Sequence, residues 1–151
     1  MIRWPTSAVA TGDLSSPEWW SAGAWAASAS VTTLPAPLFG DGATELSVQP
    51  DPRGQGWLEV QTVGFGAATL DVRSAPGFTG PWGGLSIVYT PPESSRPNVL
   101  VYAGKGHPEL TGAPLVATYA SNSTRLPTLV ADTTLYYPRF VRVSWAAPTD
   151  R

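Results

Sequence analysis

The sequence predicts an all-β chain that forms a partial β-propeller of about two to three antiparallel blades. Only 13% of the residues are charged, whereas the chain has 15 glycines, 16 prolines and 7 tryptophans. Few charges together with many turn formers and aromatic side chains favour short strands over a helical bundle. The strand-like runs follow one another through tight turns, which is the meander from which a propeller blade is built.

Composition also limits the partners that we expect. A chain of 151 residues is long enough to bury a core, and a formal net charge of −2 gives no electrostatic reason to bind nucleic acid or an anionic membrane. No apolar run reaches the roughly 18 residues that a membrane helix needs. Because the chain has no cysteine, it has neither a disulfide framework nor a thiolate metal site.

Residues 1–43 are predicted to be the outer part of a preceding blade, with an irregular, tryptophan-rich course. Residues 6–11 are expected to make a helical turn, and Pro17 stands early in a second capped turn, where its fixed backbone angle fits. Residues 34–39 must be extended, because prolines remove donors and bias their predecessors towards extended conformations.

Residues 44–97 are predicted to be one complete blade. Apolar and polar residues alternate at Leu46 to Gln49, and a turn rich in proline and glycine follows. Four short strands are expected in this part, at residues 44–49, 57–63, 69–74 and 85–89.

Residues 98–151 are predicted to be the last blade and the C-terminal end. Strands are expected at residues 99–103, 114–119 and 137–145. Superimposing residues 57–60 on 114–117 gives a repeat of about 57 residues, which is in the range of propeller repeats.

The predicted blades are too few to close a ring. A propeller needs about four to eight blades. A chain with fewer blades exposes apolar sheet faces and unpaired strand edges. Either the chain is the C-terminal part of a longer protein, or several copies complete the ring. A two-sheet sandwich is the structural alternative.

Four segments carry a resemblance to a known group of proteins. Residues 74–82, which end in Gly-Pro-Trp, resemble a hairpin of five-bladed propeller glycosidases of the arabinanase and β-xylosidase type. Residues 102–110, 121–123 and 136–142 resemble the closing blades of bacterial propeller domains of unknown function that are similar to endo-D-arabinanases. The likeness runs over residues 1–146.

This resemblance implies that the chain corresponds to the C-terminal blades of a probable five-bladed propeller more than twice as long. It implies a carbohydrate-active protein whose substrate is a polysaccharide such as an arabinan. Met1 would then be an internal start, so the localisation stays unknown, and the chain would be secreted if it is a fragment of an exported protein.

Glu45 is the first candidate catalytic residue. Glycosidic bond cleavage usually takes two carboxyl groups, one that delivers a proton and one that serves as base or nucleophile. Glu45 opens a predicted inner strand beside apolar Leu46 and Val48. Burial there would raise its pKa and suit it to proton donation. The alternative is a surface glutamate at a strand edge.

Lys105, His107 and Glu109 form a second cluster at the end of the first strand of the last blade. Their spacing places them on one face of a regular strand, although Pro108 and the flanking glycines disturb that geometry. Lys105 and His107 are expected to bind substrate, and Glu109 is the second candidate catalytic carboxyl. The alternative for His107 is a half-buried histidine that anchors the turn between the blades. A single histidine without further ligands makes no metal site, so we expect no metal and no cofactor.

Three further residues are candidate substrate-binding residues. Arg139 lies in an apolar strand, so its guanidinium must pair with an acid or reach backbone carbonyls. Asn122 either binds sugar hydroxyls or caps a turn. Tyr137 could stack on a sugar ring.

These residues predict part of a propeller glycoside hydrolase that is incomplete as a single chain. The alternative function is a non-catalytic carbohydrate-binding or structural propeller fragment that homo-oligomerisation completes. The sequence carries no dinucleotide-binding loop, phosphate-binding loop, nucleophile elbow or zinc-protease motif. The resemblance implies that the partners are a poly- or oligosaccharide and either missing blades or a second copy.

Overall fold

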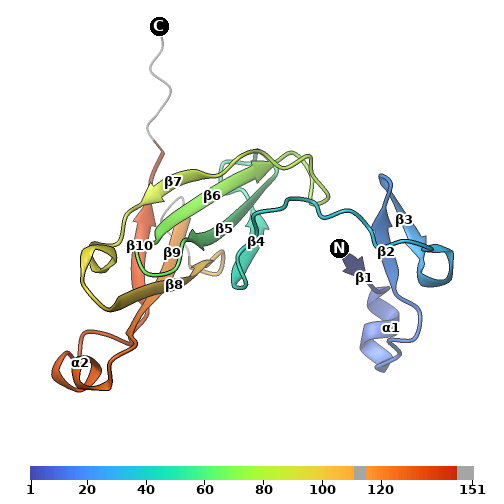
Figure 1. Ribbon diagram of the computed structural model, residues 1–151. Coiled ribbons are helices and arrows are strands. Elements are labelled where there is room, and N and C mark those ends of the chain that lie inside the picture. Colours follow the sequence, from blue (N-terminus) through green and yellow to red (C-terminus); the bar gives the residue numbers. More distant parts are fainter. Residues whose placement is uncertain (111–114, 146–151) are drawn as a thin grey trace, which may run out of the picture.

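The computed structural model describes residues 1–110 and 115–145. Three antiparallel sheets dominate this part of the chain, and none of them closes on itself (Figure 1). The prediction of an all-β chain is therefore confirmed at the level of fold class.

The N-terminal region forms the smallest sheet. Its strands pair in the order β1-β2-β3, with the short helix α1 between the first two. The elements are β1 (Ile2–Arg3), α1 (Thr6–Thr11), β2 (Glu18–Ser21), β3 (Ala24–Ala27) and the 3₁₀ turn η1 (Ser28–Ser30). No side chain in residues 1–45 is buried, and Figure 1 shows this sheet apart from the two larger ones.

The second sheet is a four-stranded meander with the order β4-β5-β6-β7. It falls where the sequence predicts a complete blade, and all four predicted strands are present. Their bounds are β4 (Leu46–Pro50), β5 (Trp57–Val63), β6 (Thr69–Ala75) and β7 (Ser86–Tyr89).

The third sheet has the order β10-β9-β8. The 3₁₀ turn η2 precedes it, and helix α2, which the sequence did not predict, joins its last two strands. The bounds are η2 (Pro92–Ser95), β8 (Val99–Gly106), β9 (Leu115–Ser123), α2 (Leu126–Ala131) and β10 (Arg139–Val143).

The strands of the third sheet differ in length from the predicted ones. The first continues from residue 103 to Gly106 through a β-bulge, and the second continues from residue 119 to Ser123. The third begins at Arg139 rather than at residue 137. Pro114, the predicted start of the second strand, lies outside the described residues.

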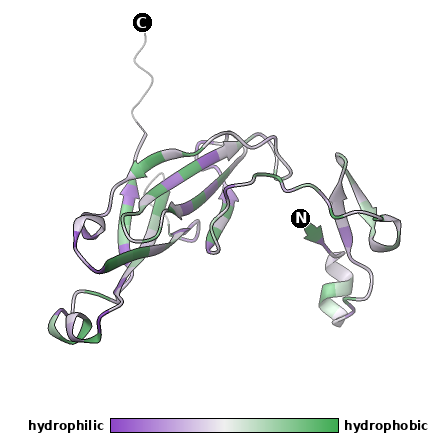
Figure 2. Cartoon of the chain, in the orientation of Figure 1, coloured by the Kyte–Doolittle hydropathy of each residue, from purple (hydrophilic) through white to green (hydrophobic). Residues whose placement is uncertain are grey.

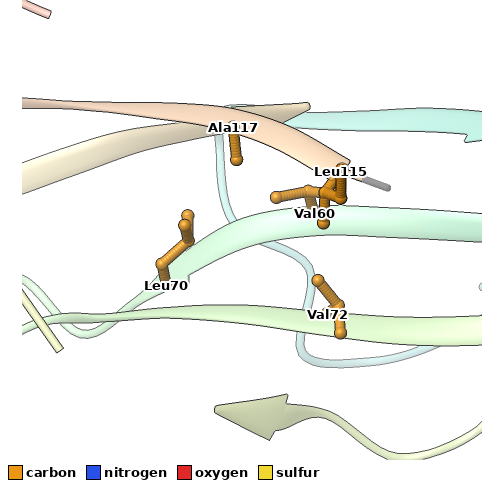
Figure 3. Packing of buried hydrophobic residues seen from close by; sticks show 5 residues of the cluster. All are labelled: Val60, Leu70, Val72, Leu115 and Ala117. Atoms are coloured by element: carbon orange, nitrogen blue, oxygen red, sulfur yellow. The ribbon is translucent and has the colours of Figure 1, made fainter. Parts of the chain in front are cut away.

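The two larger sheets pack face to face around the core. Apolar and polar residues alternate along the strands (Figure 2). Because successive side chains of a strand point to opposite faces, the apolar residues of each strand lie on one face of its sheet. The central cluster, drawn in Figure 3, comes from β5, β6 and β9 and consists of Val60, Leu70, Val72, Leu115 and Ala117. Fully burying one Val or Leu side chain stabilises the fold by about 1.5–3 kcal/mol.

The second and third sheets are stacked so that the first strand of one lies near the first strand of the other, and the last near the last. Strand β8 contacts β4 and β5, and β10 contacts β7. Two glycines bring β8 close to the other sheet: a Cβ on Gly104 would collide with the backbone nitrogen of Thr62, and one on Gly106 with the Gln49 side chain. Such packing is common to neighbouring propeller blades and to a two-sheet sandwich.

Candidate functional site

Glu45 and Lys105 line one hollow at the edge where β4 and β8 meet. This hollow measures about 320 Å³ and is bordered by residues 44–46 and 103–105. A smaller hollow of about 110 Å³ adjoins it, and Tyr102 and Phe65 line that part. We call the two together the edge hollow.

Glu45 does not have the environment that the sequence predicts. Its side chain is exposed, because it precedes the first residue of β4 instead of lying within the sheet. The expected burial of this carboxyl beside Leu46 and Val48 is therefore wrong. What the edge hollow offers is an exposed carboxylate residue, Glu45, and an exposed lysine, Lys105, on its border.

The backbone beside the edge hollow is irregular. The pairing of β8 with β9 shifts between Tyr102 and Lys105, and Ala103 has a φ of 58°. A non-glycine residue in this region is strained, and β-bulges re-aim the side chains that flank them. Here the bulge lies between Tyr102 in the smaller part and Lys105 in the larger part.

His107 and Glu109, which follow Lys105 in the chain, contact each other. The His107 ring lies with Nδ1 2.7 Å from a Glu109 carboxylate oxygen and with Nε2 2.8 Å from the Thr118 hydroxyl. The hydrogen bond with His107 holds the pKa of the exposed Glu109 carboxyl below its usual value. The Phe140 ring centroid is 5.9 Å from that of His107.

These residues occupy the outer face of the third sheet, away from the core. The pairing register puts Lys105, Thr118 and Phe140 in one row across β8, β9 and β10. A hollow of about 560 Å³ opens on this face, with Glu109, Leu110, Val116, Phe140 and Arg142 around it. The sequence placed Lys105, His107 and Glu109 in one cluster, and the structure keeps His107 and Glu109 in direct contact.

Arg139 is tied to the protein by both kinds of partner that the sequence suggested. Its guanidinium donates to the Thr134 carbonyl at 2.9 Å and lies 3.5 Å from a Glu93 carboxylate oxygen. The other Glu93 oxygen accepts a hydrogen bond from the Tyr119 hydroxyl at 2.8 Å, and burial raises the pKa of Tyr119. Arg139 thus links β10 to η2 and to the segment that holds Thr134, and Glu93 in turn contacts Tyr119 of β9.

Asn122 and Tyr137 lie apart from the edge hollow, as the residues lining it do not include them. Asn122 accepts a hydrogen bond from the backbone N–H of Ser123 at 2.7 Å, which is a local contact inside β9. Tyr137 is 65% exposed and follows Tyr136, whose φ is 70°.

One charged cluster was missed by the sequence reasoning. Glu59 of β5 and Arg73 of β6 are direct cross-strand partners, buried on the outer face of the second sheet. Arg73 donates through Nε to Glu59 at 2.8 Å and through Nη1 to Asp41 at 2.6 Å, and Phe39 covers the guanidinium at 4.1 Å. A charge in the middle of each of two neighbouring predicted strands was the signal available in the sequence.

The pKa values of the two carboxyls that contact Arg73 are shifted in opposite directions. Desolvation raises the pKa of Glu59, whereas the hydrogen bond from Arg73 lowers the pKa of the exposed Asp41. Such a divergence is found at many acid–base sites. Glu59 is fully buried, however, so we assign this cluster to the fold.

Among the described residues, no group of three or more histidine, aspartate or glutamate side chains is arranged to hold a metal ion. The described helices are all too short or too polar to cross a membrane. Comparisons with protein-family models, with curated proteins and with solved structures find no match for this chain.

Proposed function

We propose that the chain is part of a carbohydrate-active β-propeller, and that the edge hollow belongs to the saccharide-binding site of a glycoside hydrolase. The second and third sheets would be two neighbouring blades. Two features support this architecture: each sheet is a meander of consecutive strands, and the sheets stack with their strands in the same order. In that arrangement β4 and β8 are the inner strands, which border the central channel of a propeller.

The observation that carries the proposal is the meeting of Glu45 and Lys105 at one open hollow. A carboxylate accepts hydrogen bonds from sugar hydroxyls and an ammonium group donates to sugar oxygens. The aromatic rings of Tyr102 and Phe65, the latter 76% exposed, supply apolar faces in the adjoining part. Apolar surface with a few converging polar groups is typical of small-molecule sites.

Hydrolysis needs a second carboxyl group. Glu45 is the one acidic residue among the residues that line the edge hollow, and Glu109 borders the hollow on the outer face of the third sheet. The single chain is therefore expected to bind saccharide without cleaving it. Further blades would complete the reaction centre.

Calorimetric titration with a panel of arabino- and xylo-oligosaccharides tests this proposal. Glu45→Gln and Lys105→Gln each remove a charge from the edge hollow and should weaken binding at least tenfold. Asp13→Asn is the matched control, because Asp13 is an exposed carboxylate of the N-terminal region. Unchanged affinity in both hollow variants, or no binding of any glycan, would refute the assignment.

One observation favours the non-catalytic alternative. A proton-donating carboxyl is usually desolvated, and Glu45 is exposed. A carbohydrate-binding propeller fragment would retain the affinity and the effect of Glu45→Gln, but no assembly of the chain would release reducing sugar. Measuring reducing ends with the assembled protein separates the two functions.

A further inference from the structure

The N-terminal sheet presents its tryptophans on opposite faces. Successive side chains of a strand alternate between the two faces of a sheet, so Trp19 and Trp20 of β2 point in opposite directions. Trp20 packs on its cross-strand partner Trp25, with the ring centroids 5.4 Å apart. The Arg3 guanidinium lies 4.1 Å from the centroid of the Trp25 ring. The face that carries Trp20 is therefore occupied by contacts within the sheet.

Trp19 has a different environment. Its cross-strand partner on β3 is Ala26, whose small side chain leaves space beside the indole ring. Trp19 is partly exposed, and no aromatic pair or cation–π contact among the described residues includes it. The ring is therefore available to a ligand.

Trp19 lines a hollow of about 320 Å³ together with the segment that follows β3. Backbone hydrogen bonds hold the beginning of this segment: the Ser28 N–H donates to the Pro17 carbonyl and the Val31 N–H to the Ser28 carbonyl, each at 3.2 Å. Pro35 ends the lining and biases the residue before it towards an extended backbone. The whole hollow is built by residues 17–35. We call it the Trp19 hollow.

The lining of the Trp19 hollow combines an aromatic ring with hydroxyl groups. Ser28, Thr32 and Thr33 each bring a hydroxyl, and the hydrogen bonds of the part of the chain that the structure describes do not use these three groups. Leu34, which is 93% exposed, adds apolar surface at the border. Apolar surface with a few polar groups, in a volume of this order, is typical of sites for small ligands.

The residues that line the Trp19 hollow carry no charge, which limits the ligand to an uncharged one. A stacked nucleotide needs cations for its phosphates. Arg3, the cation of this sheet, lies on the other face and is paired with Glu18 at 2.8 Å. A saccharide ring meets the observed lining better: its C–H face packs on an indole ring, and its hydroxyls donate and accept hydrogen bonds, as serine and threonine hydroxyls do.

We propose that the Trp19 hollow is a second saccharide-binding site, in which a neutral sugar packs on Trp19 and bonds to the hydroxyls of Thr32 and Thr33. The volume fits a short saccharide unit. This site goes beyond the proposed function, because none of its residues lines the edge hollow. The two sites share only the class of ligand.

Two-dimensional NMR of the ¹⁵N-labelled protein tests the proposal with the same panel of arabino- and xylo-oligosaccharides. The backbone amide signals of residues 28–34 and the indole N–H signal of Trp19 should shift with a saturable dependence on saccharide concentration. The indole signal of Trp57, which packs on Phe78 in another part of the chain, is the internal reference and should not shift.

Two variants identify the groups that bind. Trp19→Thr removes the ring but keeps a strand-favouring residue, and should raise the dissociation constant measured at residues 28–34 about tenfold or more. The double variant Thr32→Val with Thr33→Val removes two hydroxyls at nearly constant volume and should raise it about fivefold or more. Thr6→Val, at an exposed threonine of α1, is the matched control and should leave the affinity unchanged.

The amide signals of β2 and β3 check that each variant is folded, and the threonine variant decides if Trp19→Thr loses them. No shift at residues 28–34 with any saccharide of the panel, or unchanged affinity in the folded variants, would overturn the proposal. Shifts with a polyproline peptide but with no saccharide would also overturn it, since proline-rich segments dock on aromatic grooves as well.

Glu45→Gln keeps the two sites separable. It should weaken the response of residues 44–46 and 103–105, which border the edge hollow, and leave that of residues 28–34 unchanged. A saccharide response at residues 28–34 alone would refute the edge hollow and leave the Trp19 hollow standing. A response at the edge hollow alone would refute the Trp19 hollow and leave the proposed function standing.

Discussion

Replacing Arg73 by methionine should cost about 3–5 kcal/mol of folding free energy at neutral pH. The Glu59 and Arg73 side chains are 0% and 2% exposed and are joined at 2.8 Å, so the variant leaves a buried carboxylate without its counter-ion. Removing one partner of a buried ion pair costs roughly this much, because the remaining charge stays desolvated. The loss is a large part of the roughly 5–15 kcal/mol that stabilises a typical domain.

Urea denaturation followed by tryptophan fluorescence measures this loss. With a slope of about 2 kcal/mol per molar urea, the midpoint should fall by about 2 M. The pH dependence gives a second signature. Burial raises the pKa of Glu59 in the folded protein above its ordinary value of 4.5, and Arg73 opposes that rise. A raised folded-state pKa means that the folded protein gains stability by binding the proton.

Arg73→Met removes the hydrogen bond and the positive charge that lower the pKa of Glu59. The pKa of Glu59 in the folded protein should therefore rise further. The difference from wild type should therefore be smallest below about pH 4.5 and grow as the pH rises through the folded-state value. The double variant Glu59→Gln with Arg73→Met removes the stranded charge and should recover most of the lost stability. A loss below about 1 kcal/mol, or the same loss in the Glu59→Gln background, would refute the reasoning.

Three other substitutions test the packing of the core and one buried hydrogen bond. Gly104→Ala should destabilise the protein by about 1–3 kcal/mol in urea unfolding, because the added Cβ would collide with the backbone of β5. The control Gly84→Ala should be nearly neutral in the same titration, because open space surrounds Gly84. Leu70→Ala should cost about 2–5 kcal/mol in thermal or urea unfolding, because Leu70 is 0% exposed in the core. Tyr119→Phe should cost about 1–3 kcal/mol, since the buried Glu93 loses a hydrogen bond of 2.8 Å; a change within 0.5 kcal/mol would contradict this.

The strands were predictable where local pattern decides them. The alternation at residues 46–49 and the turn formers that bound residues 57–63 and 69–74 placed the second sheet correctly. The continuation of β8 to Gly106 was not predictable, because the glycines that interrupt the strand pattern are required by close contact with another sheet.

The candidate site was predictable in part. The sequence grouped His107 with Glu109 correctly, and it named both kinds of partner that Arg139 contacts. It could not place Glu45 and Lys105 at one hollow, because their proximity depends on how the two sheets stack. The burial of Glu59 was missed because it depends on Phe39 and Asp41, which lie over Arg73 on the outer face of the second sheet.

The small N-terminal sheet has a thermodynamic consequence of its own. With no buried side chain in residues 1–45, its hairpin β2–β3 is supported chiefly by backbone pairing and by contacts such as that between Trp20 and Trp25, whose ring centroids are 5.4 Å apart. Local opening there should require little free energy, so its amide protons should exchange with deuterium far sooner than those of β5 and β9. A partner that binds these tryptophans would slow the amide exchange of the hairpin. The exchange rate of β2 and β3 therefore reports on assembly.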